Sequence, residues 1–283
     1  MRAGTSRLVS ADLSARIAVI PGIFLGGNGG KGGSDEAFVQ VLDGVTGDSW
    51  YEAFPAQDFL ADPRRFDVAI ARNRFGERGI DVGLEGSGLA GRVDFTSPLD
   101  PWPVTPTAPG VMGRYAWVPV MECYHGLLSF GHDLSGTLTL GGRHLDFSGG
   151  RGYLEKDWGR AFPAAYVWMQ SNHFSVLGLS LSASIAIVPW GRTRFRGFIV
   201  GLRTPEGLHR FATYTGAQVT MLEIDDAEVK WRLTSPQGES LELVAERRRG
   251  GSSMPPFAPR CTVAWKKRST LASMCGWPMR RER

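Results

Sequence analysis

A chain of 283 residues, of which 21% are charged and 11% aromatic, is long enough to bury one large or two medium-sized cores and does not resemble a disordered protein. Its formal net charge of +4 is misleading, because seven Lys or Arg and one acid lie from Gly250 onward, so the remainder carries a net charge of −2. An excess of basic over acidic residues that is confined to a tail is not the pattern of a nucleic-acid-binding surface. We therefore predict no nucleic-acid partner.

The longest apolar stretch, Ile17–Leu25, is too short to cross a bilayer and is interrupted by Pro21 and Gly22. Asp12 precedes it and no clean cleavage site follows, so it does not fit a signal peptide either. We interpret it as a buried strand. The three cysteines form no motif, which agrees with a reducing compartment. We therefore expect a cytoplasmic protein with at most peripheral membrane contact.

Short segments of alternating apolar and polar residues recur along the chain, as in half-buried strands. The clearest are 66–71, 134–140, 217–223, 228–233 and 241–245. Turn-forming Gly, Pro and Asp residues separate them at a spacing of roughly ten residues, which is typical of β-barrels and sandwiches. No segment has convincing helical periodicity, and the sequence predicts an all-β fold with little helix.

The Pro-rich stretch Pro101–Pro109 cannot lie inside a central strand and indicates a boundary between two β units. We place a first barrel-like half at residues 1–115 and a second half at 116–253. Residues 254–283 lose the alternation and are predicted to be an irregular basic tail.

The segment Arg151–Phe174 has the most unusual composition. Read as a strand, its first part places Tyr153, Glu155 and Asp157 on one face. After a break at Gly159 and Pro163, a second strand places four more polar and aromatic side chains on one face: Tyr166, Trp168, Gln170 and Asn172. A face with both polar and aromatic side chains is poorly suited to a hydrophobic core. It indicates either a ligand cavity or a polar network that pins two strands together.

Other catalytic arrangements receive little support from the sequence. The five histidines show no metal-ligand spacing and no Cys pairs accompany them, so we predict no metal. No serine lies in a GxSxG nucleophile motif. His125 lies upstream on an expected strand, where it serves either as a structural residue or as a catalytic partner.

Residues 152–174 fit the pattern GY-x-EK-x-WG-x-x-FP-x-x-Y-x-W-x-Q-x-N-x-F. This pattern resembles the signature of the tocopherol cyclase-like family, and the preceding His125-Gly126 also matches that family. Segments 19–44 and 197–215 resemble its earlier and later strands. The similarity extends from about Leu8 to Ser253.

The resemblance implies two lipocalin-like β-barrel or sandwich halves, related to carotenoid hydratase-like proteins. It further implies cyclisation of a prenylated quinol: a proton adds to the prenyl alkene, and the phenol oxygen captures the tertiary cation, with no cofactor. The expected partner is thus an apolar or prenylated small molecule.

This chemistry needs a carboxylic acid held neutral in a dry cavity and aromatic faces beside the cation. Asp157 is the first candidate for the acid and Glu155 the second, with His125 as a further catalytic residue. Six residues are the candidates for substrate binding: Tyr153, Trp158, Tyr166, Trp168, Gln170 and Asn172. Lys156 alternates to the opposite face. A lipocalin-like carrier of an apolar ligand and a purely structural relative are the competing hypotheses. A carrier needs the cavity without the acid.

Both ends of the chain change character abruptly, and we hypothesise that they are read out of frame. A two-base shift allows the tail to contain a PLRAP element and residues 1–7 to read AGWYFK directly before Leu8, both similar to the family's ends. The chain would then lack its opening and closing strands and would be prone to aggregate. We expect resequencing of the gene to find insertions or deletions near the codons for Arg7 and Ser253. An unchanged gene would leave a genuinely divergent tail.

Overall fold

The computed structural model describes residues 2–26, 35–119, 121, 123–160, 163, 165–190, 193–246, 260–267 and 270–275. Within these ranges strands dominate and no helix reaches seven residues. The prediction of an all-β fold with little helix is confirmed. The three short 3₁₀ segments are η1 (Ala56–Asp58), η2 (Gly113–Trp117) and η3 (Thr213–Thr215).

The chain divides into two compact units, and each is built from segments that are far apart in the sequence. The first comprises Met1–Trp102, Cys123–Ala161 and Gly251–Met254, and the second Pro103–Glu122, Phe162–Gly250 and Pro255–Arg283. The boundary placed at residue 115 by the sequence falls inside the segment Pro103–Glu122. The chain therefore leaves the first unit, returns to it for residues 123–161, and leaves again.

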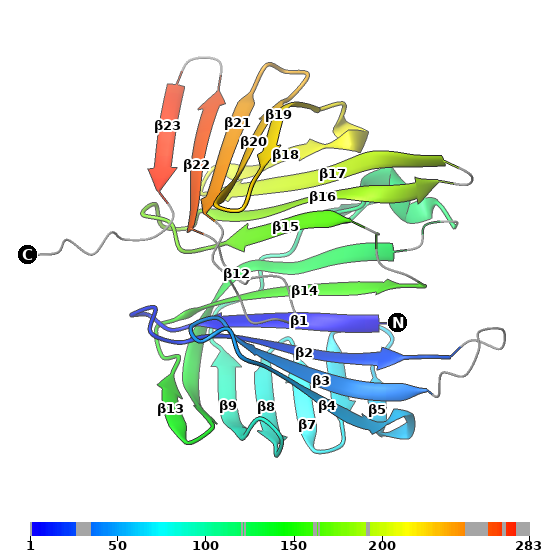
Figure 1. Cartoon of the computed structure of the whole chain (residues 1–283), viewed down its shortest axis with the longest axis vertical. Coiled ribbons are helices and arrows are strands. Elements are labelled where there is room, and N and C mark those ends of the chain that lie inside the picture. Colours follow the sequence, from blue (N-terminus) through cyan, green and yellow to red (C-terminus); the bar gives the residue numbers. More distant parts are fainter. Residues whose placement is uncertain are drawn as a thin grey trace, which may run out of the picture. The chain divides into compact units, whose positions relative to one another are not determined.

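The first unit contains a twelve-stranded antiparallel sheet, counted over the described residues (Figure 1). Along the sheet the order is β4-β3-β2-β1-β14-β12-β9-β8-β7-β6-β5, with β13 paired to β12. The strands are β1 (Arg2–Val9), β2 (Arg16–Phe24), β3 (Glu36–Asp43), β4 (Ser49–Pro55), β5 (Phe59–Ala61), β6 (Asp67–Ile70), β7 (Asn73–Gly76), β8 (Gly79–Leu84), β9 (Leu89–Phe95), β12 (Cys123–Leu140), β13 (Arg143–Asp146) and β14 (Arg151–Gly159).

This sheet curls around one apolar core. Val19 and Val39 from β2 and β3 belong to the same buried cluster as Ile80 and Val93 from β8 and β9. Strands that are far apart in the sheet order can share a core only if the sheet folds back on itself, as in barrels and curled sandwiches. Burial of these β-branched side chains is the main stabilising term.

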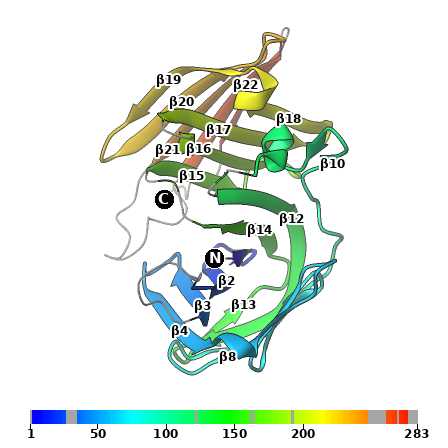
Figure 2. The same ribbon diagram turned by 90° about the vertical axis from the view of Figure 1, so that its right-hand side faces the viewer.

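The long strand β12 changes partners along its length. Its first part pairs with β14, from Cys123 to Asp133, and its second part pairs with β9, from Leu134 to Thr139. Two register shifts, at 127/129 and 129/132, precede the change. Bulges of this kind bend a strand, and Figure 2 shows β12 strongly curved.

Two polar side-chain contacts join parts of the curled sheet whose strands do not pair with each other. Glu52 of β4 accepts hydrogen bonds from the backbone N–H and the hydroxyl of Ser87, at 3.0 and 3.1 Å. The buried carboxylate of Asp43 forms an ion pair with Arg143 of β13. Both contacts span parts of the chain that the sheet alone does not connect.

The second unit contains a hairpin and two sheets. The strands are β10 (Val104–Thr105), β11 (Ala108–Pro109), β15 (Tyr166–Ser171), β16 (Ser180–Trp190), β17 (Thr193–Thr204), β18 (Gly207–Ala212), β19 (Gln218–Ile224), β20 (Glu228–Thr234), β21 (Ser240–Glu246), β22 (Arg260–Lys267) and β23 (Thr270–Cys275). Strands β15–β18 form one sheet and β19–β23 the other. Met169, Val200 and Phe211 of the first share a core with Trp231 and Leu243 of the second.

Strands lie near both ends of the described chain. Residues 2–9 form β1, which pairs with both β2 and β14. The described parts of the tail are the backbones of β22 and β23, which extend the sheet from β21. The irregular basic tail expected for residues 254–283 stays a prediction. Strand pairing uses main-chain groups, so a segment without clear alternation can still join a sheet edge. The other tail residues lie outside the described ranges.

Candidate functional site

A cluster of ionisable side chains lies on one face of β14 and its two neighbours. In the sheet, β14 lies between β1 and β12 (Figure 1), so each of its residues has two cross-strand partners. Asp157 lies opposite His125, and Tyr153 lies opposite Arg7. Residues directly opposite share a face, so these four side chains are on the same side as Glu155.

Short contacts connect the cluster. His125 Nδ1 lies 2.8 Å from Asp157 Oδ1, a hydrogen bond that the carboxylate accepts. The other ring nitrogen, Nε2, is 3.7 Å from Glu155 Oε2. The Tyr153 hydroxyl donates a 2.6 Å hydrogen bond to the same Glu155 oxygen. The imidazole of His125 thus lies between two carboxyl groups.

The two carboxyl groups of the cluster, Glu155 and Asp157, differ in burial. The Glu155 side chain is only 7% exposed, against 23% for Asp157. Burial disfavours the carboxylate and raises the pKa of Glu155 to about 7, although the charge of His125 opposes this. Burial also disfavours the imidazolium, but the charge and hydrogen bond of Asp157 outweigh it and raise the pKa of His125 to about 9. Near neutral pH the cluster can therefore both hold and release a proton.

Trp158 and Lys156 lie on the opposite face of β14 from the acids. The Trp158 ring stacks on Tyr124 of β12 with centroids 5.6 Å apart, and Lys156 Nζ lies 5.2 Å from the Trp158 centroid. The predicted placement of Lys156 away from the acids agrees with this arrangement. Trp158, a predicted substrate contact, is not brought to the acid face.

The remaining predicted contacts lie on or just after β15, in the second unit. Tyr166, Trp168 and Gln170 share the face opposite Met169, which belongs to the core of that unit. Tyr166 is half exposed, whereas Gln170 and Asn172 are buried. Asn172 follows the last residue of β15. Their role as substrate contacts stays a prediction.

Arg7 is the member of the cluster that the sequence did not indicate. It is 7% exposed and interacts electrostatically with Tyr153 and Glu155. Nothing in the local pattern marks it, because an arginine before Leu8 is typical of a solvent-facing strand position. Only the pairing of β1 with β14 shows that this side chain is buried.

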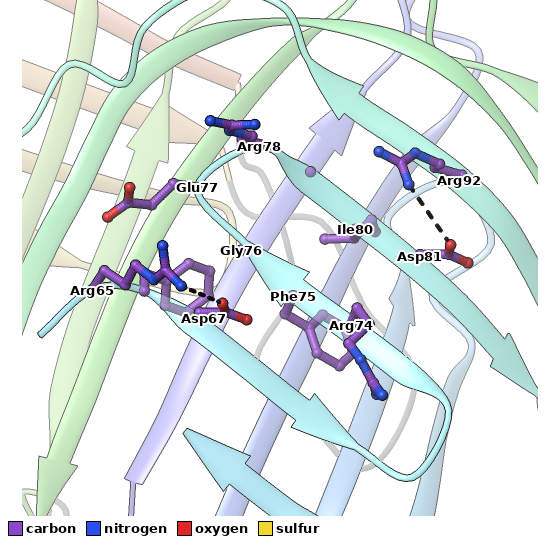
Figure 3. A pocket seen from close by; sticks show the side chains of 12 residues that line it. Arg65, Asp67, Arg74, Phe75, Gly76, Glu77, Arg78, Ile80, Asp81 and Arg92 are labelled. Carbon is purple, nitrogen blue, oxygen red and sulfur yellow. Dashed lines mark ion pairs between the residues drawn. The ribbon is translucent and has the colours of Figure 1, made fainter. Parts of the chain in front are cut away.

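A separate pocket of about 240 Å³ lies in the first unit, at β6–β9 (Figure 3). Its lining includes two ion pairs, Arg65 with Asp67 at 3.7 Å and Arg92 with Asp81 at 4.0 Å. The predicted acids and aromatic residues do not line it. A wall of paired charges does not suit a prenyl chain, and we assign no function to this pocket.

A second buried histidine supports β12 at its bulges. His132 is 1% exposed, its Nδ1 lies 3.0 Å from Ser129 Oγ, and its ring packs 4.1 Å from that of Phe95. Burial, with a smaller contribution from the charge of Arg151, lowers the pKa of His132 to about 4. This residue stays neutral through the physiological range and is structural.

We expect His132 to make the fold sensitive to acid. The unfolded chain binds a proton at this residue near pH 6.5, whereas the folded chain resists it until about pH 4. Its contribution to stability is therefore present above pH 6.5 and is lost as the pH falls toward 4, at about 1.4 kcal/mol per pH unit. Denaturant unfolding of the wild type and His132→Gln at pH 7 and pH 5 measures this difference. Equal pH dependence of the two proteins would contradict it.

Two further observations concern the described residues only. They contain no group of three or more His, Cys, Asp or Glu side chains arranged to hold a metal ion. Across the same residues, no helix has the length and apolar character needed to cross a membrane.

Comparison with solved structures identifies the fold. The structure is similar to the crystal structure of kievitone hydratase from Nectria haematococca, with a TM-score of 0.53 and 12% sequence identity over 97% of this chain and 86% of that chain. At this identity the likeness establishes the fold alone, which is the lipocalin-like β architecture expected from the sequence.

The family follows from the sequence match. The model of the family described as "Tocopherol cyclase-like" matches residues 93–243, more than half of the chain, and the chain belongs to this family. The probable chloroplastic tocopherol cyclase of Oryza sativa subsp. japonica is 25% identical over 126 residues, which is 43% of this chain. That match spans only 27% of the rice protein. The part of this chain that the family model matches, residues 93–243, includes His125 and the whole of β14.

Proposed function

We propose that this protein catalyses a proton-initiated, cofactor-independent cyclisation of a prenylated quinol or a similar isoprenoid. One observation carries the proposal. The family-matched segment contains a buried carboxyl, Glu155, whose pKa is raised by burial to about 7, beside a His125–Asp157 pair. A carboxylic acid that is half protonated near neutral pH suits general acid catalysis.

In the proposed reaction the neutral Glu155 carboxyl donates its proton to one carbon of the prenyl double bond. The second alkene carbon becomes a tertiary cation, and the phenol oxygen forms a new C–O bond to it. The phenolic proton then returns to the Glu155 carboxylate. Atoms and charge balance within one substrate molecule, and neither an oxidant nor a reductant is consumed.

This assignment reverses the order of the two acids that the sequence favours. Asp157 is more exposed and holds His125 through Nδ1, so we give it an orienting role. His125, with its raised pKa, carries the positive charge that stabilises the Glu155 carboxylate after proton transfer. Tyr153 fixes one oxygen of that carboxylate by its hydrogen bond.

A lipocalin-like carrier of an apolar ligand is the second candidate. The lipocalin-like fold is compatible with it, because barrels of this kind can enclose a ligand without catalysing a reaction. A carrier has no need of an acid with a shifted pKa, which is why we prefer the enzyme.

Two measurements distinguish these functions. Mass spectrometry of lipids that co-purify with the protein identifies the class of ligand. Incubation with prenylated quinols then tests for a product of unchanged mass and altered retention, as ring closure requires. A bound lipid that is recovered unaltered would support the carrier, and a product heavier by one water would indicate hydration instead of cyclisation.

We expect Asp157→Asn to reduce turnover while ligand binding survives. The amide cannot supply the negative charge that favours the imidazolium, so the pKa of His125 should fall. The loss should amount to roughly 10²-fold, at the lower end of the range for acid–base groups. Rates as a function of pH, with ligand affinity measured in parallel, test this. Equal activity would remove Asp157 from the mechanism, and loss of folding would support a structural polar network.

A further inference from the structure

Arg7 is a buried charge that must be compensated within the cluster. It lies on β1 opposite Tyr153, and its neighbour on the same face, Thr5, lies opposite Glu155. A guanidinium that is 7% exposed is costly unless nearby groups balance it. Tyr153 and Glu155 favour the charged form of Arg7, while Arg16 of β2 acts on it as a like charge.

The balance of charges indicates what Arg7 does to Glu155. His125 and Asp157 form a pair of opposite charges at 2.8 Å and shift the pKa of Glu155 in opposite directions. When it is ionised, the Glu155 carboxyl favours the charged form of Arg7. A neighbouring cation favours the ionised form of a carboxyl, so Arg7 acts against burial. Without Arg7, Glu155 would hold its proton more tightly.

We propose that Arg7 is a positioning residue, which holds the Tyr153–Glu155 pair beside β1 and keeps the Glu155 carboxyl ready to give up its proton. This inference rests on the proposed function only for its consequence in catalysis; the effect on Glu155 is independent of any substrate.

The protonation midpoint of Glu155 tests the proposal directly. Infrared spectra of the full-length protein with ¹³C-labelled glutamate, recorded against pH with Glu155→Gln as the blank, report this one carboxyl. The titratable and charged groups that act on it are Arg7 on β1, His125 on β12, and Tyr153 and Asp157 on β14. Of these, Arg7→Met removes only the charge in question.

We expect Arg7→Met to shift the midpoint upward, because the cation that favours the ionised carboxyl is lost. Arg7→Lys should restore a midpoint close to that of the wild type. Arg2→Met is the matched control, because Arg2 lies on the same strand, is exposed and pairs with Trp158 on the opposite face. It should leave the midpoint unchanged. A folded Arg7→Met with the wild-type midpoint would overturn the proposal.

A second measurement covers the case in which Arg7→Met does not fold. If Arg7 and Glu155 compensate each other, the double variant Arg7→Met/Glu155→Gln should regain the cooperative denaturant transition that Arg7→Met lacks. A double variant that stays unfolded, while Glu155→Gln alone folds, would contradict the coupling. Neither readout needs turnover, so a failure of the proposed cyclase function leaves this test intact, and a normal midpoint leaves the cyclase proposal standing.

Discussion

Glu155→Gln is expected to reduce turnover by about 10²–10⁴-fold or more, the range for loss of a general acid. Glutamine has the same shape as the neutral carboxylic acid but no acidic proton to give to the alkene. It can still accept the hydrogen bond from Tyr153, so the local packing should survive. Ligand binding should therefore remain close to that of the wild type while kcat falls.

The measurement is single-turnover conversion of a prenylated quinol, with affinity determined separately by fluorescence or co-purification. Asp157→Asn provides the comparison, because Asp157 lies on the other side of His125. The loss of turnover should be smaller in Asp157→Asn than in Glu155→Gln. Glu155→Asp keeps an acid but withdraws it by one methylene, so it should recover part of the rate. Unchanged turnover in a folded Glu155→Gln variant would falsify the assignment of the acid.

Gly152→Ala is expected to destabilise the fold by about 3 kcal/mol, the upper part of the range for overpacking. A Cβ at this position would overlap His132 Nε2, in a site where the backbone of β14 is confined between β1 and β12. The imidazole cannot swing away, since the Phe95 ring packs against it at 4.1 Å. Either the ring or β14 must shift, and Glu155 lies three residues further along the same strand.

Chemical denaturation gives the change in the free energy of unfolding. Gly76→Ala is a matched control on strand β7, because a Cβ there meets nothing closer than a backbone oxygen at 3.5 Å. It should cost well under half as much. In a His132→Ala background, Gly152→Ala should lose most of its effect, since the clash partner is gone. If Gly152→Ala lowered the free energy of unfolding to the same extent in that background, the strain would not arise from the contact with His132.

The sequence by itself determined the fold class and the composition of each strand face. Turn formers at regular spacing and alternating side chains lead to an all-β chain, because the two-residue period of a strand is a local property. The same period places Tyr153, Glu155 and Asp157 together, and it also places Trp158 on the other face with Lys156. The match to the family added the lipocalin-like architecture, which no local pattern contains.

The tertiary structure alone decided which strands flank β14 and what their side chains do to the acids. The contact of His125 with Asp157 joins residues 32 positions apart, and Arg7 reaches Tyr153 across still more of the chain. Alternation shows which side a residue faces but not which strand lies beside it, since any two antiparallel strands can pair through their backbones. For this reason the burial that raises the pKa of Glu155, and with it the preference for Glu155 over Asp157, emerged only once the strands were placed side by side.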